Sequence, residues 1–264
     1  MEENNTNQTE ILTQEVTDDL TPVTAMEAIT GVITEPSYTF ENISQNKPRH
    51  YWVFPVIIFI VANIISMLLF YSDTELYSSV MDKQRKNMEE RFDKSIKEGK
   101  MTQEQKSVAM ETAEKFMNPK SPFAIAIAVG ASVIGPFIIM VLVSVIYLFC
   151  FKIIKAEIVF TNILNVVGLT FIISSIAKIL ETVLSIITGK LTNFSLGFLF
   201  SEESFGSSIS ALISKVDVFS LWALIVTAIG LTLIGKVKSK AMYFFVFGLW
   251  LIWSLISAFL LPSQ

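Results

Sequence analysis

The sequence predicts an all-α, polytopic integral membrane protein with five transmembrane helices and a charged extramembrane helical hairpin. Five apolar runs carry this prediction, because a helix needs about 20 mostly apolar residues to cross a hydrocarbon core roughly 30 Å thick. The composition agrees: 52% of the 264 residues are hydrophobic, 17% are charged and 21 are Phe. Backbone amides in lipid find no water, so each run must close its own hydrogen bonds as a helix.

The chain begins with a polar, acidic segment. Residues 1–46 contain nine Asp and Glu residues and no Lys or Arg. Residues 1–20 hold few large apolar groups that could offset the entropy of ordering, so we expect them to be disordered. This acidic segment also argues against nucleic acid as a partner.

A short amphipathic helix is predicted within residues 21–50, ahead of the first span. Thr21 suits the N-cap and Pro22 the first helical position, and Pro36 ends the run. Apolar side chains recur at helical spacing between them: Val23, Met26, Ile29 and Ile33. Such a helix could lie in the membrane interface or pack on the edge of the bundle, and its pattern fits both.

Residues 51–261 form the predicted membrane domain. Its five apolar runs are 51–71, 122–151, 161–187, 219–234 and 241–261. With the N-terminus inside, the short inner segments hold the excess of basic residues, namely Lys47, Arg49, Lys152, Lys155, Lys236, Lys238 and Lys240. Because cytoplasmic loops are enriched in Lys and Arg, we expect a cytoplasmic N-terminus and a C-terminus on the opposite side. In a prokaryote this would be the cytoplasmic membrane.

The predicted hairpin occupies residues 72–120, outside the membrane. Its first helix carries one apolar stripe: Leu76, Val80, Met88, Phe92 and Ile96. Gly99 is a natural C-terminal cap, and Thr102 with Gln105 forms a capping box for the second helix. The stripe has two interpretations. In the first, it packs on the bundle or on a second copy of the chain. In the second, it is a docking surface for another protein. It is therefore the candidate partner-binding surface.

Lys178 and Glu181 are charged residues within the third apolar run, three positions apart on one helical face. A charged pair inside a span can couple protons or hold a charged substrate. The competing reading places the pair at the outer interface, where a Lys side chain extends its amine to water. The second reading is favoured, because about 20 residues separate Lys178 from the start of the run near Phe160.

The sequence offers no catalytic set. His50 is the single histidine and Cys150 the single cysteine, so one chain cannot assemble a Ser-His triad, a His cluster for a metal or an intramolecular disulfide. We therefore expect no enzyme activity, no cofactor and no metal.

Three sequence segments resemble the YIP1 family. They are GVITEPSYTFENI (31–43), FTNILNVVGL (160–169) and DVFSLWALIVTAIGL (217–231), and the resemblance extends over residues 25–261. The signature positions are Pro36, Phe40, Asp217, Phe219, Trp222 and Gly230. The chain is closer to the prokaryotic branch, because it lacks the DLYGP-like motif of eukaryotic members, which are linked to Rab GTPases. The resemblance implies five spans with a cytoplasmic N-terminus.

The function expected from these features is that of a non-enzymatic membrane organiser or adaptor. Its expected partners are the lipid bilayer and other proteins, with a second copy of the chain among the candidates. The alternative is a small transporter or channel with Lys178 and Glu181 near the substrate path. The adaptor function depends on the apolar stripe of the hairpin, whereas transport depends on Lys178 and Glu181.

Overall fold

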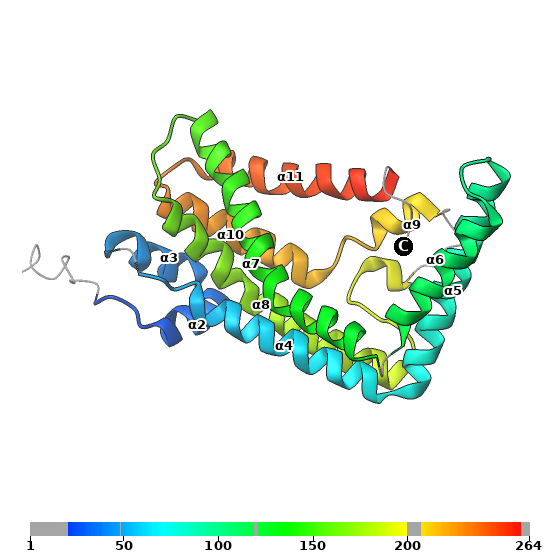
Figure 1. Ribbon diagram of the computed structural model, residues 1–264. Helices are drawn as coiled ribbons and strands as arrows, with labels where there is room; N and C mark the ends of the chain where they lie inside the picture. The colour runs from blue at the N-terminus through cyan, green and yellow to red at the C-terminus, as the bar shows by residue number, and fades with distance from the viewer. Residues whose placement is uncertain (1–20, 48, 119–120, 200–206, 260–264) are drawn as a thin grey trace, which may run out of the picture.

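The computed structural model describes residues 21–47, 49–118, 121–199 and 207–259, and these segments are helical with no strand among them. Figure 1 shows a bundle of long helices with a two-helix projection at one end. The acidic tail predicted to be disordered, residues 1–20, lies outside the described residues. So do residues 119–120, which end the hairpin segment, and residues 260–264.

Two short helices, α2 (Ala25–Thr34) and α3 (Pro36–Gln45), precede the bundle. The prediction of an N-cap at Thr21 is wrong, because Thr24 and Glu27 form a reciprocal capping box. The Thr24 backbone N–H donates to Glu27 Oε2 at 2.7 Å. Two donors at the helix start are thereby satisfied, which fixes the start of α2 three residues later than the sequence pattern indicated.

The α2–α3 pair packs on the bundle, which is one of the two placements that the sequence left open. Ala28 and Val32 of α2 are fully buried, whereas Met26 is 67% exposed. The helix α2 contacts α8, and α3 contacts α10. Pro36 ends the first apolar run as predicted, and it also begins α3, since a proline fits the first turn of a helix.

Four helices of the described chain are long and apolar enough to cross a membrane. They are α4 (Val53–Ser72), α7 (Pro122–Ile153), α8 (Phe160–Thr188) and α11 (Ser239–Phe259). The apolar helix α10 (Val218–Ile234) is shorter, with 17 residues. Length and composition thus single out four of the five predicted spans, with α10 at the short limit.

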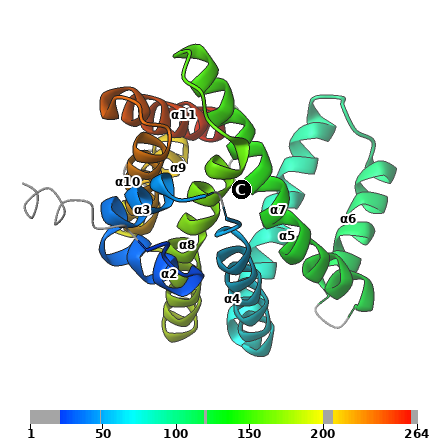
Figure 2. The same cartoon turned by 90° about the vertical axis from the view of Figure 1, so that its left-hand side faces the viewer.

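These five helices run back and forth between two ends of the bundle. In Figure 1, α2 and α3 lie at the end where α4 begins, and α5 and α6 lie at the end where α4 finishes. The helix α8 is central, because it contacts α4, α7 and α10, as Figure 2 shows. Accordingly, 56% of the most apolar 18-residue stretch of α8 is buried, whereas 22% of the corresponding stretch is buried in α4 and in α11.

The segment predicted to form the hairpin contains two helices, α5 (Thr74–Lys97) and α6 (Gln103–Met117), which together are called the arm below. Gly99 adopts the left-handed conformation with φ +68°, as expected for a helix end. Thr102 and Gln105 form the predicted capping box. The arm stands beside the bundle in Figure 2 and joins it at α4 and α7.

Candidate functional site

Three signature residues lie where the N-terminal helices meet the bundle. Phe40 of α3 is fully buried. A Cβ atom at Gly230 of α10 would lie 2.9 Å from the Phe40 ring and 2.7 Å from Cγ1 of Val166. Only glycine permits that approach. Because Pro36 begins the helix that carries Phe40 one turn later, the three positions build one packing site between α3, α8 and α10.

The other three signature residues lie at the start of α10. Asp217 is its N-cap, and Oδ1 accepts the Ser220 backbone N–H at 2.9 Å. Phe219 meets the ring of Phe194 edge-on, with 5.3 Å between centroids. Phe219 and Trp222 both pack against the buried core. These residues therefore fix the start of a helix and the loop before it.

Lys178 and Glu181 are not joined by an ion pair. The Lys178 side chain is exposed and Glu181 is half-buried, with the Phe194 backbone N–H as the hydrogen-bond partner of its carboxylate. Lys178 lies 18 residues into α8, about 27 Å along the helix. A helix of that rise crosses most of a hydrocarbon core roughly 30 Å thick.

The arm divides the predicted partner-binding stripe into two parts. Leu76 and Val80 are 1% and 8% exposed, because the chain itself covers them. Met88, Phe92 and Ile96 are half-buried. Each of these three side chains therefore keeps part of its surface accessible. They are called the arm seam below.

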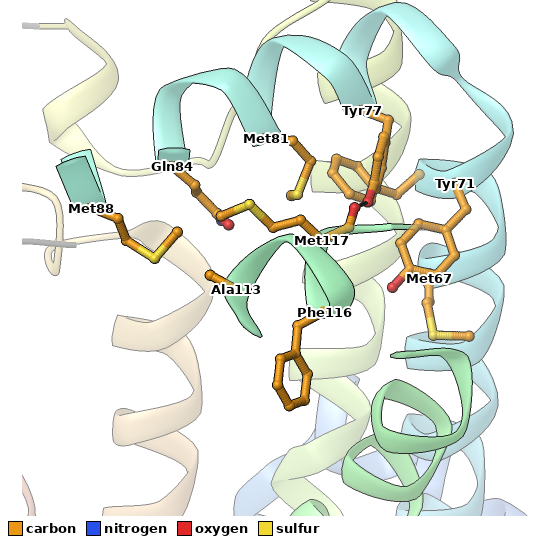
Figure 3. A pocket seen from close by; sticks show the side chains of 10 residues that line it. Met67, Tyr71, Tyr77, Met81, Gln84, Met88, Ala113, Phe116 and Met117 are labelled. Carbon is orange, nitrogen blue, oxygen red and sulfur yellow. Dashed lines mark hydrogen bonds between the residues drawn. The ribbon is translucent and has the colours of Figure 1, made fainter. Parts of the chain in front are cut away.

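A groove of about 490 Å³ lies between the end of α4 and the arm (Figure 3). Its ten lining residues are mostly apolar or aromatic: Met67, Phe70, Tyr71, Tyr77, Met81, Gln84, Met88, Ala113, Phe116 and Met117. Four of them are methionines, whose unbranched thioether side chains adapt to irregular partners. This cavity is called the arm groove below.

Among the polar side chains of the arm groove, that of Tyr77 is engaged within the chain. The Tyr77 hydroxyl donates to the Met117 carbonyl oxygen, which ties α5 to the end of α6. Burial raises the pKa of Tyr77 above its ordinary value. Phe70 and Tyr71 each lie 5.5 Å from the Tyr77 ring, centroid to centroid. The groove thus offers apolar contact, with Gln84 as its amide side chain.

Ion pairs hold the two arm helices together. Arg85 of α5 lies 3.4 Å from Glu114 of α6, and Lys106 of α6 pairs with Asp93 of α5. The Arg85–Glu114 pair is half-exposed on both sides, so it contributes little to stability. Its effect is on the register of α5 against α6.

Sequence reasoning identified one lining residue of the arm groove, Met88, and missed the cavity. The helical spacing of Met81 and Met88, seven apart, and of Ala113 and Met117, four apart, places each pair on one face of its helix. No local pattern joins these faces to Met67, because that contact depends on how the arm folds back onto α4.

Within the described segments, no three His, Cys, Asp or Glu side chains gather where they could hold a metal ion. Cys150 is buried in α7, and the His50 ring contacts the Trp52 ring edge-on at 6.3 Å.

Comparison with protein families gives one match, in which the Yip1 domain covers residues 30–261. Neither the curated proteins nor the solved structures gave a match. The matched range contains every signature residue, the arm and all the long apolar helices. The chain therefore belongs to the Yip1 domain family and is a multi-pass integral membrane protein.

Proposed function

We propose that this protein is a non-enzymatic membrane organiser that binds other proteins through its arm. The observation that carries the proposal is the arm seam: Met88, Phe92 and Ile96 are half-buried on a charged hairpin that stands beside the bundle. An amphipathic helix of a partner would cover this seam and complete a three-helix bundle. The partner is a second copy of the chain or another membrane protein with such a helix.

The topology that we propose has five spans, with α10 as the fourth. Its 17 residues rise about 25 Å, which lies at the short end of the range for a spanning helix. The alternating course of the helices in Figure 1 supports this count. The N-terminus is then cytoplasmic, because the inner loops hold the excess of Lys and Arg, and the arm and the C-terminus face the opposite side.

The missing eukaryotic motif supports assignment to the prokaryotic branch of the family. In such an organism the protein would reside in the cytoplasmic membrane, with the arm on its outer face. The partners that we propose are then membrane proteins whose extramembrane helices reach this face.

Quantitative co-purification from native membranes tests the adaptor function. The variant F92S/I96S removes two apolar side chains from the seam, and truncation of central contact residues typically weakens binding about tenfold or more. K83S/E90S is the matched control, because it changes two exposed residues of α5 and leaves the net charge unaltered.

We expect a specific polypeptide to be lost with F92S/I96S and retained with K83S/E90S. Hydrogen exchange across α5 checks that the arm remains helical in both. Equal recovery of every co-purifying protein from the three samples would contradict the proposal.

The alternative function is transport past Lys178 and Glu181. It predicts that K178L and E181L abolish a solute flux while the chain remains folded. The exposure of Lys178 and the lack of an ion pair between the two residues favour the adaptor function over this alternative.

A further inference from the structure

The arm groove is too small for the helix that would cover the arm seam. A helix of three turns, about 10 Å across and 16 Å long, occupies on the order of 1,200 Å³. The groove holds about 490 Å³, which lies within the range of about 300–1,000 Å³ for small-ligand sites. The groove therefore fits an occupant that is narrower than a helix.

The lining specifies an apolar occupant. Met81, Met88 and Met117 present flexible thioether chains, and Figure 3 shows them with Gln84 along one side of the groove. The Tyr77 hydroxyl is already bonded to the Met117 carbonyl oxygen. Gln84 is exposed and can donate to an ester or carboxylate oxygen at the polar end of a ligand.

The position of the groove makes membrane lipid the available occupant. Met67, Phe70 and Tyr71 belong to the last turns of α4, so one wall is the end of a membrane-spanning helix. On the same helix Leu68 is 56% exposed and Ile65 is 44% exposed, which continues the apolar surface into the bilayer. Tyr side chains favour this level of the membrane, at the boundary with water.

A second wall also begins at the membrane. Phe116 of α6 is 47% exposed and lies 5.4 Å, ring to ring, from Phe123 in the first turn of α7. The groove is thus lined by the end of α4 and by both arm helices, and its Phe116 wall contacts the first turn of α7. A hydrocarbon chain could enter it from the outer leaflet without passing through water.

We propose that the arm groove binds one hydrocarbon chain of a membrane lipid. The chain lies among the thioethers of Met81, Met88 and Met117, and its polar end lies toward Gln84. The groove shares Met88 with the arm seam, but binding of a lipid chain in it does not require a protein partner at Phe92 or Ile96. The chain could belong to a phospholipid or to a free fatty acid, which share the same apolar contact.

Photolabelling of the full-length protein in phosphatidylcholine vesicles tests this site. One preparation contains a phospholipid with a diazirine in its acyl chain, and another contains the free fatty acid with the same diazirine. Labelled positions are read by mass spectrometry. We expect peptides that contain residues 81–88 and 113–117 to be labelled more strongly than the exposed Ile58 and Ile65 of α4.

The variant A113F fills the groove, and T112F places the same side chain at the adjacent exposed position as the control. Each methylene of the lipid chain that is buried in the groove adds to the affinity of the lipid. If A113F excludes two of these methylenes, groove labelling falls about tenfold. T112F should label like the unchanged protein. If A113F fails to fold, M81Q takes its place, with M81L as its control.

Labelling by both probes, or by either one, supports the site and identifies the source of the chain. Two results would overturn the proposal. One is groove labelling no stronger than labelling of Ile58 and Ile65. The other is unchanged groove labelling in a folded A113F or M81Q variant.

Discussion

At the residue scale, close approach between helices depends on Gly230. The Cβ atom of G230A would lie 2.7 Å from Val166 Cγ1 and 2.9 Å from the Phe40 ring, so α3 or α10 must shift. Overpacking of this kind typically costs about 1–3 kcal/mol. We expect a lower melting temperature in mild detergent, measured by intrinsic fluorescence.

The control for this prediction is G248A. Nothing lies within 4 Å of a Cβ at Gly248, which is also in a helix, α11. Alanine favours a helix over glycine by about 1 kcal/mol, so G248A should match or exceed the stability of the unchanged protein. Equal melting temperatures for G230A and G248A would disprove the packing role of Gly230.

Asn165 joins the start of the first span to α8. Its Nδ2 donates to the Arg49 carbonyl oxygen at 2.7 Å, and its Oδ1 accepts the Trp52 backbone N–H at 3.3 Å. N165A should lower stability by about 1–3 kcal/mol, because two backbone groups lose their partner. N162A is the contrast, because the buried Oδ1 of Asn162 has no hydrogen-bond partner. If N162A lowers the stability as much as N165A does, the stabilising role of the two Asn165 hydrogen bonds is contradicted.

At the scale of elements, the cap of α2 makes its stability depend on pH. Hydrogen bonds from Thr24 hold the pKa of Glu27 below its usual value of 4.5. A pKa that is lower in the folded protein stabilises the fold at neutral pH, and this contribution disappears as the pH falls through the folded pKa. We expect hydrogen exchange in α2 to accelerate, relative to intrinsic rates, below about pH 4.5.

The variant E27Q tests the origin of that pH dependence. Its amide oxygen accepts the Thr24 N–H at every pH, but it carries no charge to titrate. Protection of α2 in E27Q should therefore vary less with pH than in the unchanged protein. The same acid response in both proteins would show that another group is responsible.

Elements defined by local chemistry could be predicted from the sequence, and those defined by distant contacts could not. The Gly99 cap and the Thr102–Gln105 box depend on residues within one helical turn, and both were predicted correctly. The start of α2 was misplaced, since Thr21 and Thr24 are both good caps. The capping box with Glu27 decides between them.

At the scale of the whole molecule, the sequence revealed long apolar helices but not how they pack. Length and hydropathy identify α4, α7, α8 and α11 as candidate spans. The burial of Phe40 against Gly230, 190 positions away in the chain, has no local signal. The arm groove depends likewise on how the arm folds back onto α4, and from the sequence its walls were recognised only as separate helices.

Accessibility labelling tests the five-span topology. In a C150A background, single cysteines replace the exposed Lys100, Lys190 and Lys238. If α10 crosses the membrane, K100C and K190C react with an impermeant reagent from the outside, and K238C reacts from the cytoplasm. Reaction of K190C and K238C from the same side would show that α10 does not cross.

The most direct test of the adaptor function is site-specific photocrosslinking in native membranes. A photoreactive phenylalanine analogue replaces Phe92 in the arm seam, and the same analogue replaces the exposed Glu90 as the control. The proposal predicts a discrete polypeptide adduct from position 92 that is absent from position 90. Equal adducts from both positions, or none from position 92, would contradict binding of a protein at the arm seam.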